Sequence, residues 1–431
     1  MTCLEAWKDK SDRKPLLLFG ARQVGKTWAL RHFGTTNFEH CAYFSLDEET
    51  NIAEIFQRTK DPHRIIEQLS FLSEVPIRPH TTLLILDEIQ DCPEALASLK
   101  YFCEKAPEYA VACAGSLLGL TVGHKGFSFP VGKVDHLNMY PLTFSEFLLA
   151  RDPRLHAYFA SINTPEPLPQ LFFDRLNEAF MAYRICGGMP EAAVAMLDGD
   201  MMRVEEKLTN ILKDYSLDFI KHTTPVQANK ITHIWTSIPS QLAKENRKFI
   251  YQVVRPGARA REYEDALLWL QNAGLIYKLN LCREPRLPLQ AYDDLNIFKV
   301  YTFDIGLLRR LAGMDSGIYL AQHEQFKEFR GALNENYVLQ SLIPQIPHPL
   351  RYWTSGNQAE LEFLIQYGND IIPVDAKSGN SITSKSLTEY NKTFSPRLRL
   401  RYSMRNLVLD GNLLNIPLFL ADRTNVLLNA L

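Results

Sequence analysis

Short apolar runs alternate with amphipathic stretches along the first third of the chain. We predict strands at 16–19, 42–46, 83–86, 109–114 and 134–137, with helix-like patterns between most of them. This alternation is typical of βαβ units, in which helices cover both faces of a parallel sheet. Pro141 and an aromatic helix over 144–149 close the region, so we expect an α/β domain over residues 1–150.

The pattern then becomes mostly helical. A Pro-rich stretch at 164–169 indicates a loop, and Gly187-Gly188-Met189-Pro190 indicates a sharp turn between helices. Helical periodicity at 231–242 and 261–273 is followed by strand-like runs at 275–281 and 298–303, and another α/β segment begins near residue 317. We therefore expect a helical lid or connector at 151–238, a small helix-and-hairpin module at 239–316 and a further α/β domain at 317–431.

Composition excludes several classes of protein. A length of 431 residues favours two or three domains, and 46% apolar with 22% charged residues is ordinary for a globular chain. The net charge of −2 excludes a globally basic nucleic-acid binder. Seven scattered cysteines without a Cys-x-x-Cys pair indicate reduced thiols. The polar segment 1–14 lacks a signal-peptide core and no apolar run matches a membrane span, so we expect a cytoplasmic protein with no membrane partner.

The segment after the first predicted strand carries a phosphate-binding motif. Gly20-Ala21-Arg22-Gln23-Val24-Gly25-Lys26-Thr27 fits G-x-x-x-x-G-K-[ST] completely, and a helix is predicted directly after it. Its glycines allow backbone N–H groups to converge on phosphate oxygens at a helix N-terminus. We expect Lys26 to reach the β- and γ-phosphates of ATP and Thr27 to ligate Mg²⁺.

The third predicted strand ends in two acids, Asp87 and Glu88. Ligands of open α/β sheets bind outside the carboxyl ends of the strands, so these acids should face the same nucleotide. We expect Asp87 to hold Mg²⁺ through water and Glu88 to orient or deprotonate the attacking water, which favours hydrolysis over phosphoryl transfer to a metabolite. After the next strand, Ser116 is predicted to sense the γ-phosphate, and Lys133 is a weaker candidate for a charge near it. No residue can be nominated as an arginine finger, so assembly into an oligomer stays open.

A β-hairpin is predicted near the C-terminus. Residues 360–366 and 371–377 alternate, and Gly368-Asn369 is expected to be the two-residue turn between them. In this register, position i pairs with position 737 − i. Alternate positions make one clean apolar face, whereas the other face carries charged residues.

The charged face of this hairpin places acids together. Glu362 falls opposite Asp375, and Glu360 falls opposite Lys377. Directly opposed carboxylates repel each other, and a bound Mg²⁺ would relieve the repulsion. Glu335, on a predicted helix, is a further candidate metal ligand. The alternative is a solvated acidic face in which Lys377 is the partner of Glu360.

The middle of the chain carries a local excess of positive charge. Six basic residues lie between positions 244 and 262, against two acidic ones, and Arg255, Arg259 and Arg261 are among them. Helices followed by a strand pair resemble a winged helix, whose second helix could enter the major groove of DNA. The alternative is a small packing module whose charges are solvated.

Motifs along nearly the whole chain resemble a bacterial and archaeal family of AAA-type ATPases that carry an uncharacterised C-terminal domain. The matching stretches are FGARQVGKT, LLILDEIQ, AGSLLGL, YPLTFSEFL, GGMPEA, YTFDIGLLRRLAG, GALNENYVL and AELEFLI…IIPVDAKSG. The resemblance implies an ATPase domain, a winged-helix-like middle and a C-terminal fold similar to restriction endonucleases of the PD-(D/E)-x-K type.

The same resemblance assigns roles to the C-terminal acids. By position, Glu335 would be the acid on the helix, Glu362 the metal-binding acid, and Asp375 with Lys377 the (D/E)-x-K pair. Glu362 stands where Asp is usual and Asp375 where Glu is usual, so each carboxylate is moved by a methylene group. Lys133 stands where Arg is common.

These features leave two main hypotheses for function. The first is an ATP-driven, nucleic-acid-directed enzyme whose C-terminal acids cut a phosphodiester with Mg²⁺. The second is a nucleotide-dependent switch whose C-terminal domain only binds DNA or a protein. A third, a small-molecule phosphotransferase, is disfavoured by Glu88.

Overall fold

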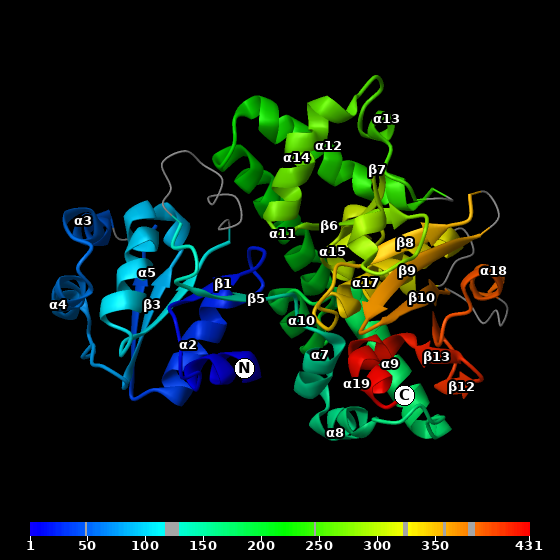
Figure 1. The fold of residues 1–431 in the computed structure, drawn as a ribbon, viewed down its shortest axis with the longest axis horizontal. Coiled ribbons are helices and arrows are strands. Elements are labelled where there is room, and N and C mark those ends of the chain that lie inside the picture. Colours follow the sequence, from blue (N-terminus) through cyan, green and yellow to red (C-terminus); the bar gives the residue numbers. More distant parts are fainter. Residues whose placement is uncertain (48–49, 117–128, 245–246, 322–325, 357–358, 378–383) are drawn as a thin grey trace. The chain divides into compact units, whose positions relative to one another are not determined.

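The computed structural model describes residues 1–47, 50–116, 129–244, 247–321, 326–356, 359–377 and 384–431 (Figure 1). Contacts divide the chain into two compact units. The first contains Met1–Tyr140 and Asn272–Gly274, and the second contains Pro141–Gln271 and Leu275–Leu431. Helix α7 (Phe144–Arg151) packs with α8 (Pro153–Ser161) and α9 (Gln170–Cys186) of the second unit.

The first unit is built on a sheet of five strands in the order β2-β3-β4-β1-β5. Every pairing in this sheet is parallel, which confirms the predicted βαβ arrangement. The observed strands match the predicted ones to within two residues at each end. They are β1 (Leu16–Phe19), β2 (His40–Ser45), β3 (Thr82–Asp87), β4 (Ala110–Ala114) and β5 (Asp135–Asn138).

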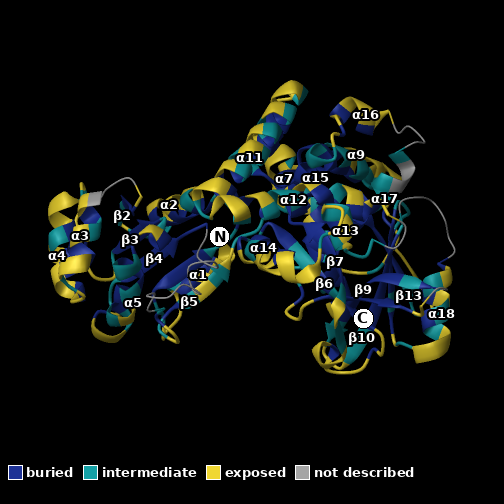
Figure 2. Ribbon diagram, turned by 90° about the horizontal axis from the view of Figure 1, so that it is seen from above, coloured by how far each residue is buried: buried dark blue, intermediate teal, exposed yellow. Residues whose placement is uncertain are grey.

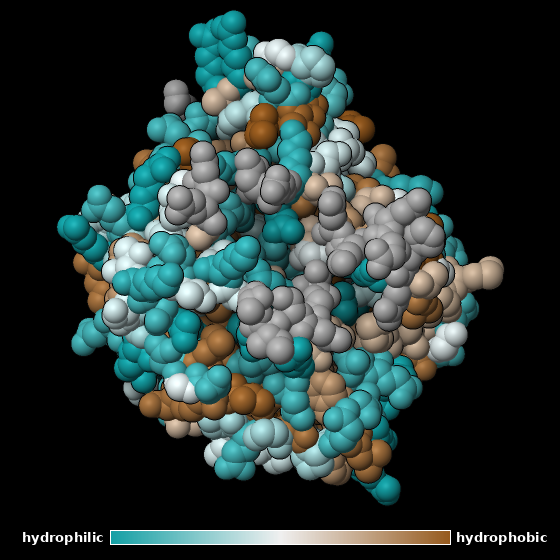
Figure 3. All heavy atoms as spheres, turned by 90° about the vertical axis from the view of Figure 1, so that its right-hand side faces the viewer, coloured by the Kyte–Doolittle hydropathy of each residue, from teal (hydrophilic) through white to brown (hydrophobic). Residues whose placement is uncertain are grey.

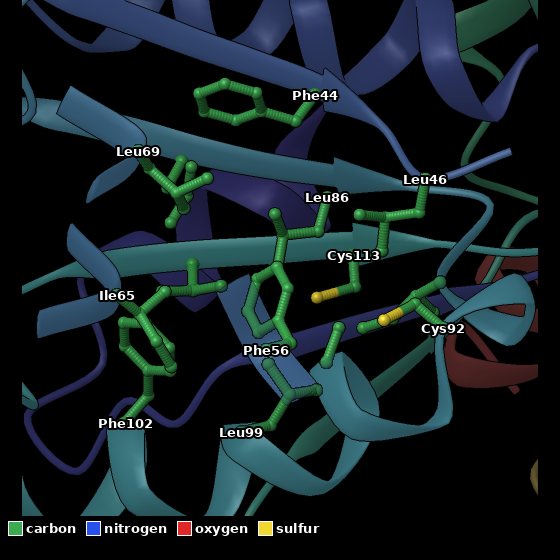
Figure 4. Packing of buried hydrophobic residues seen from close by; sticks show 14 of the residues in the cluster. Phe44, Leu46, Phe56, Ile65, Leu69, Leu86, Cys92, Leu99, Phe102 and Cys113 are labelled. Carbon is green, nitrogen blue, oxygen red and sulfur yellow. The ribbon is translucent and has the colours of Figure 1, made fainter. Parts of the chain in front are cut away.

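Helices cover both faces of this sheet, as the alternation of apolar strands and amphipathic segments requires. Leu16 and Leu18 pack with Trp7 and Leu30 on one face, whereas Leu17 points to the opposite face. That opposite face carries the larger core, in which Phe44, Leu86 and Cys113 pack together with helix residues (Figure 4). The helices are α1 (Thr2–Lys8), α2 (Lys26–Asn37), α3 (Thr50–Arg58), α4 (Pro62–Leu72), α5 (Pro93–Lys105) and the short 3₁₀ helix η1 (Ile89–Asp91).

The second unit begins with a group of helices. The predicted turn at Gly187 is confirmed, since the chain reverses there between α9 and α10 with Gly187 at φ 68°. A Cβ atom at this glycine would lie 2.3 Å from Asp304 Oδ1, so the close approach itself requires glycine. The described helices after α9 are α10 (Pro190–Leu197), α11 (Met201–Lys221), α12 (Pro225–Leu242), α13 (Tyr251–Val254), α14 (Ala260–Asn272), η2 (Leu289–Tyr292), α15 (Ile305–Leu311), α16 (Ser316–Leu320), α17 (Lys327–Leu342), α18 (Lys385–Phe394), η4 (Leu418–Arg423) and α19 (Thr424–Asn429).

An eight-stranded sheet forms the centre of the second unit, in the order β12-β13-β11-β10-β9-β8-β6-β7. Strands β6 and β7 form the hairpin expected in the module at 239–316, and β6 also pairs with β8. The module therefore shares a sheet with the C-terminal segment, a partnership that strand alternation cannot reveal. The strands are β6 (Ile276–Cys282), β7 (Asp293–Thr302), β8 (Arg351–Thr354), β9 (Glu360–Tyr367), β10 (Asp370–Ala376), β11 (Arg399–Ser403), β12 (Val408–Asp410) and β13 (Leu413–Pro417).

The C-terminal hairpin of β9 and β10 has the predicted register. Tyr367 pairs with Asp370 and Phe363 with Val374, with Gly368 at φ 57° in the turn. Both faces are nevertheless covered, because Leu364 is as fully buried as Phe363. Helices α17 and α18 pack against these strands, which are mostly dark blue in Figure 2. The alternative of a solvated acidic face is therefore wrong.

Three further observations concern membrane crossing, the cysteines and the surface. Across the described parts of the chain, no helix combines the length and apolar character that a membrane crossing needs. All seven cysteines are free thiols. The face of the second unit seen in Figure 3 is mostly hydrophilic, with hydrophobic side chains in small separate patches.

Candidate functional site

The predicted phosphate-binding loop connects β1 to α2. Gly20 has φ 152°, and a Cβ atom there would lie 2.3 Å from the carbonyl oxygen of Met139. Gly25 has φ 94° and caps the N-terminus of α2. Because only glycine tolerates these conditions well, the loop brings backbone N–H groups to a helix N-terminus, where anions bind.

Lys26 is held tightly against this loop. Its Nζ atom donates hydrogen bonds to the carbonyl oxygens of Gly20 at 3.0 Å and Ala21 at 2.8 Å. Burial lowers the pKa of Lys26 to about 8, although the charges of Glu88 and Asp87 oppose the shift. The lysine therefore lies within electrostatic reach of both acids, which places the three charges expected around a triphosphate in one site.

Thr27 and Asp87 meet directly. Thr27 Oγ1 donates to Asp87 Oδ2 at 2.6 Å, and Tyr43 donates its hydroxyl hydrogen to the same oxygen at 3.1 Å. Asp87 is buried, and the charge of this carboxylate adds to burial in raising the pKa of Tyr43 to about 12. Hydroxyl and carboxylate oxygens at this distance are hard ligands of the kind that Mg²⁺ prefers.

Glu88 follows at the end of β3 in a left-handed conformation, with φ 48°. Its Oε2 atom accepts a hydrogen bond from Gln90 Nε2 at 2.6 Å and a longer one from Ser116 Oγ at 3.4 Å. Left-handed backbone is uncommon for residues other than glycine and is concentrated at functional sites. The structure thus brings Ser116, the last described residue before position 129, next to the predicted base.

The weaker prediction for Lys133 is wrong. Its Nζ atom lies 2.9 Å from Glu104 Oε1, at the end of α5. Lys133 precedes β5, whose first residue pairs with the first residue of β1, so the lysine lies at the amino ends of the strands. The phosphate-binding loop lies at their carboxyl ends, on the opposite edge of the sheet.

Sequence reasoning missed two residues of this site, Tyr43 and Gln90. Tyr43 lies on β2 opposite Ile85, so the two-residue period of the strands places it on the same face as Asp87. Gln90 lies two residues after Glu88 in the motif LLILDEIQ. Neither residue type by itself signals a role, but a register argument could have found Tyr43.

A second group of acids lies within the second unit. We call Glu335, Glu360, Glu362 and Asp375 the acid cluster. Asp375 is fully buried, and Glu335 and Glu362 are nearly so. The backbone N–H of Ala376 donates a hydrogen bond to Glu362 Oε2 at 3.2 Å. The last regular pair of the hairpin is Phe363 with Val374, so the next pair in the same register places Glu362 opposite Asp375.

Three cations of the same chain offset this negative charge. Arg247 Nη1 makes a very short ion pair with Glu335 Oε1, and Lys299 Nζ makes one with Glu360 Oε1. Lys377 therefore does not pair with Glu360, as the rejected alternative required, but with Asp375 Oδ1 at 2.6 Å. Arg247 was counted in the predicted basic surface, and the structure instead commits it to a buried pair.

Glu362 is the least compensated member of the acid cluster. Burial, followed by the charges of Asp375 and Glu335, raises the pKa of Glu362 well above its usual value. Neither carboxylate oxygen of Asp375 accepts a hydrogen bond with good geometry from the described residues, although the ammonium of Lys377 lies close to one of them. Among the described residues, however, no three His, Cys, Asp or Glu side chains converge as a metal-binding group.

The predicted nucleic-acid residues Arg255, Arg259 and Arg261 are all exposed. Helix α14, which was expected to enter the major groove of DNA, also exposes Glu262, Glu264 and Asp265. Its outer face is therefore not basic. Arg255 lines a cavity of about 630 Å³. The other lining residues are Val226, Asn229, Lys230, His233, Glu262 and Tyr263.

Three family models match different parts of the chain. Residues 12–148 match the model of an AAA domain. Residues 177–317 and 330–419 match two models that are each described as a domain of unknown function, DUF8612 and DUF4143. The first unit thus carries an AAA-type P-loop ATPase domain. Among curated proteins, none matches the chain.

Several solved structures are similar to the chain at low identity and low TM-score. The Walker-type ATPase PABY2304 of Pyrococcus abyssi is 16% identical, with a TM-score of 0.43, over 72% of this chain and 93% of that one. The ORC2 protein of Aeropyrum pernix is 12% identical, with a TM-score of 0.31, over 72% and 89%. The RuvB branch migration motor of Thermotoga maritima is 15% identical, with a TM-score of 0.28, over 67% and 87%. Likenesses this distant carry no functional assignment.

Proposed function

We propose that this chain hydrolyses ATP with Mg²⁺ and that its nucleotide cycle governs the second unit. One observation carries the first part: Thr27 Oγ1 lies 2.6 Å from Asp87 Oδ2, with Glu88 next in the chain. Thr27 would hold Mg²⁺ directly and Asp87 through water. When bound, the metal would neutralise charge on the β- and γ-phosphate oxygens.

The chain's own residues divide the remaining work. Backbone N–H groups of the loop and Lys26 bind the phosphates, and Glu88 takes a proton from the attacking water. The water oxygen bonds to the γ-phosphorus, and the bond between that phosphorus and the bridging oxygen breaks. ADP leaves with that electron pair, and Ser116 is placed to report on the γ-phosphate beside Glu88.

Turnover by the variant Glu88→Gln tests this proposal. We expect hydrolysis to slow by at least ~100-fold while nucleotide affinity is kept, because loss of a general base affects the chemical step. Lys26→Ala is the matched comparison, since it should weaken nucleotide binding itself. ATP hydrolysis at the wild-type rate by purified Glu88→Gln protein would rule out the assigned role.

We also propose that the acid cluster cleaves a phosphodiester with Mg²⁺. In favour, Asp375 is fully buried without a well-formed hydrogen bond, and Glu362 is held near it. Two carboxylates plus substrate phosphate are a usual set of ligands for Mg²⁺. When bound, the metal would polarise the scissile phosphate, and Lys377 would stabilise the charge that develops there.

One contact favours the competing function, a nucleotide-dependent switch that binds nucleic acid or protein without cutting. Glu335 is committed to Arg247, which removes the helix acid from the set of free ligands. Cleavage of DNA by the wild type with Mg²⁺, lost in Asp375→Ala while ATP turnover persists, would establish the nuclease. Binding of DNA without cleavage would establish the switch. In that case, neutralising Arg255, Arg259 and Arg261 together should weaken the binding and make the affinity less dependent on salt.

A further inference from the structure

Gln90 lies buried beside the proposed base of the ATPase. Its Nε2 atom donates to Glu88 Oε2 at 2.6 Å, the shortest hydrogen bond described for this carboxylate. The orientation of the amide is fixed by chemistry, since an ionised carboxylate only accepts hydrogen bonds and must therefore face the NH₂ group.

The backbone after Glu88 explains how Gln90 comes back to it. Glu88 is the N-cap of η1, and the carbonyl oxygen of Glu88 accepts from Asp91 N at 2.9 Å. Cys92 N closes the next turn on the carbonyl oxygen of Ile89 at 3.2 Å. This tight turn reverses the chain within three residues, so a side chain two positions after the acid can reach its carboxylate.

The other end of the amide argues against a purely structural role. Gln90 Oε1 is buried and accepts no hydrogen bond from the described residues. A buried polar group without a partner destabilises a fold, and a methionine of similar length would fill the same space without that penalty. The amide is therefore best explained by what its NH₂ group does for Glu88.

We infer that Gln90 is a positioning residue for ATP hydrolysis. It fixes the carboxylate of Glu88 through Oε2, so that the second oxygen, Oε1, is presented to the attacking water. This inference rests on the proposed role of Glu88 as the base.

A double-mutant cycle of Gln90→Met and Glu88→Gln tests the inference. Gln90→Met should lower kcat for ATP by at least ~10-fold, the scale of one hydrogen bond to a charged group, with KM unchanged. In the Glu88→Gln background the same change should have less than about a twofold effect, because a residue that acts through Glu88 cannot act without it. Glu94→Gln, which alters a charge near the same turn, is the matched control and should keep the wild-type rate.

The outcomes separate this inference from the function on which it rests. If Glu88→Gln hydrolyses ATP normally, the role of Glu88 fails and the inference fails with it. If Glu88→Gln is slow but Gln90→Met is normal, or if the two effects multiply, only the role of Gln90 is overturned. Gln90→Asn, which keeps the amide on a shorter side chain, checks folding. If Gln90→Asn and Gln90→Met both bind nucleotide as tightly as the wild type but have a reduced kcat, the positioning role is supported. If both variants lose nucleotide affinity, that role is overturned.

Discussion

At the scale of single residues, the nucleotide site depends on charges held out of water. Lys26 is buried against carbonyl oxygens of its own loop, while Asp87 and Glu88 oppose the loss of its charge. Glu88 and Asp87 are in turn held by neutral donors, namely Gln90, Tyr43 and Thr27. A buried lysine loses its proton more easily than an exposed one, so its charge becomes sensitive to pH near neutrality.

This burial predicts how nucleotide affinity depends on pH. The pKa of Lys26 is about 8, so its ammonium is present below that pH and lost above it. Between about pH 7.5 and 9.5 the affinity for ATP should fall roughly tenfold, because the phosphates are then bound by a neutral amine. Titration calorimetry at both pH values measures this. The Lys26→Met variant should bind ATP weakly at both pH values. If its affinity for ATP depends on pH as strongly as that of the wild type, another group causes the pH dependence.

At the scale of elements, the acid cluster joins β9 and β10 to distant parts of the chain. Helix α17 supplies Glu335, strand β7 supplies Lys299, and Arg247 comes from the segment after α12. The ion pairs of Arg247 and Lys299 each join segments that the sequence separates by dozens of residues. Such pairs are desolvated, so removing one partner leaves the other charge buried and uncompensated.

The pair of Arg247 and Glu335 gives a prediction at this scale. Arg247→Ala should lower the free energy of unfolding of the second unit by about 3 kcal/mol, since Glu335 is only 2% exposed. Urea denaturation followed by a spectroscopic signal measures the change. Arg259→Ala, which alters an exposed arginine, should stay within about 0.5 kcal/mol. A similarly small change in Arg247→Ala would mean that the ion pair is not maintained in solution.

At the scale of the whole molecule, the chain consists of two compact units with separate cores. The phosphate-binding loop, Asp87, Glu88 and Ser116 all belong to the first unit, whereas the acid cluster belongs to the second. A ligand stabilises only the unit that binds it, unless the two units unfold together.

Calorimetric unfolding should therefore distinguish the two units. A non-hydrolysable ATP analogue with Mg²⁺, at about 100 times its Kd, should stabilise the first unit by about 2.7 kcal/mol and raise one transition only. Lys26→Ala should abolish that shift. If both transitions move together in the wild type but not in Lys26→Ala, the two units are coupled in folding.

The sequence by itself determined the parallel sheet, the phosphate-binding loop, the acids of β3 and the register of the C-terminal hairpin. These features depend on local rules: the two-residue period of strands, the backbone freedom of glycine and the geometry of a two-residue turn. The same rules placed Lys26, Thr27, Asp87 and Ser116 at one site, because the carboxyl ends of parallel strands share an edge.

Only the tertiary structure decided which distant groups meet. It assigned Arg247 to Glu335 and Lys133 to Glu104, joined the hairpin of β6 and β7 to the C-terminal sheet, and buried an acidic face that alternation alone leaves open to solvent. Periodicity records which side of an element is apolar, but not what covers the other side. Burial and ion pairing between remote segments depend on how the elements pack, and that information lies in no single stretch of the chain.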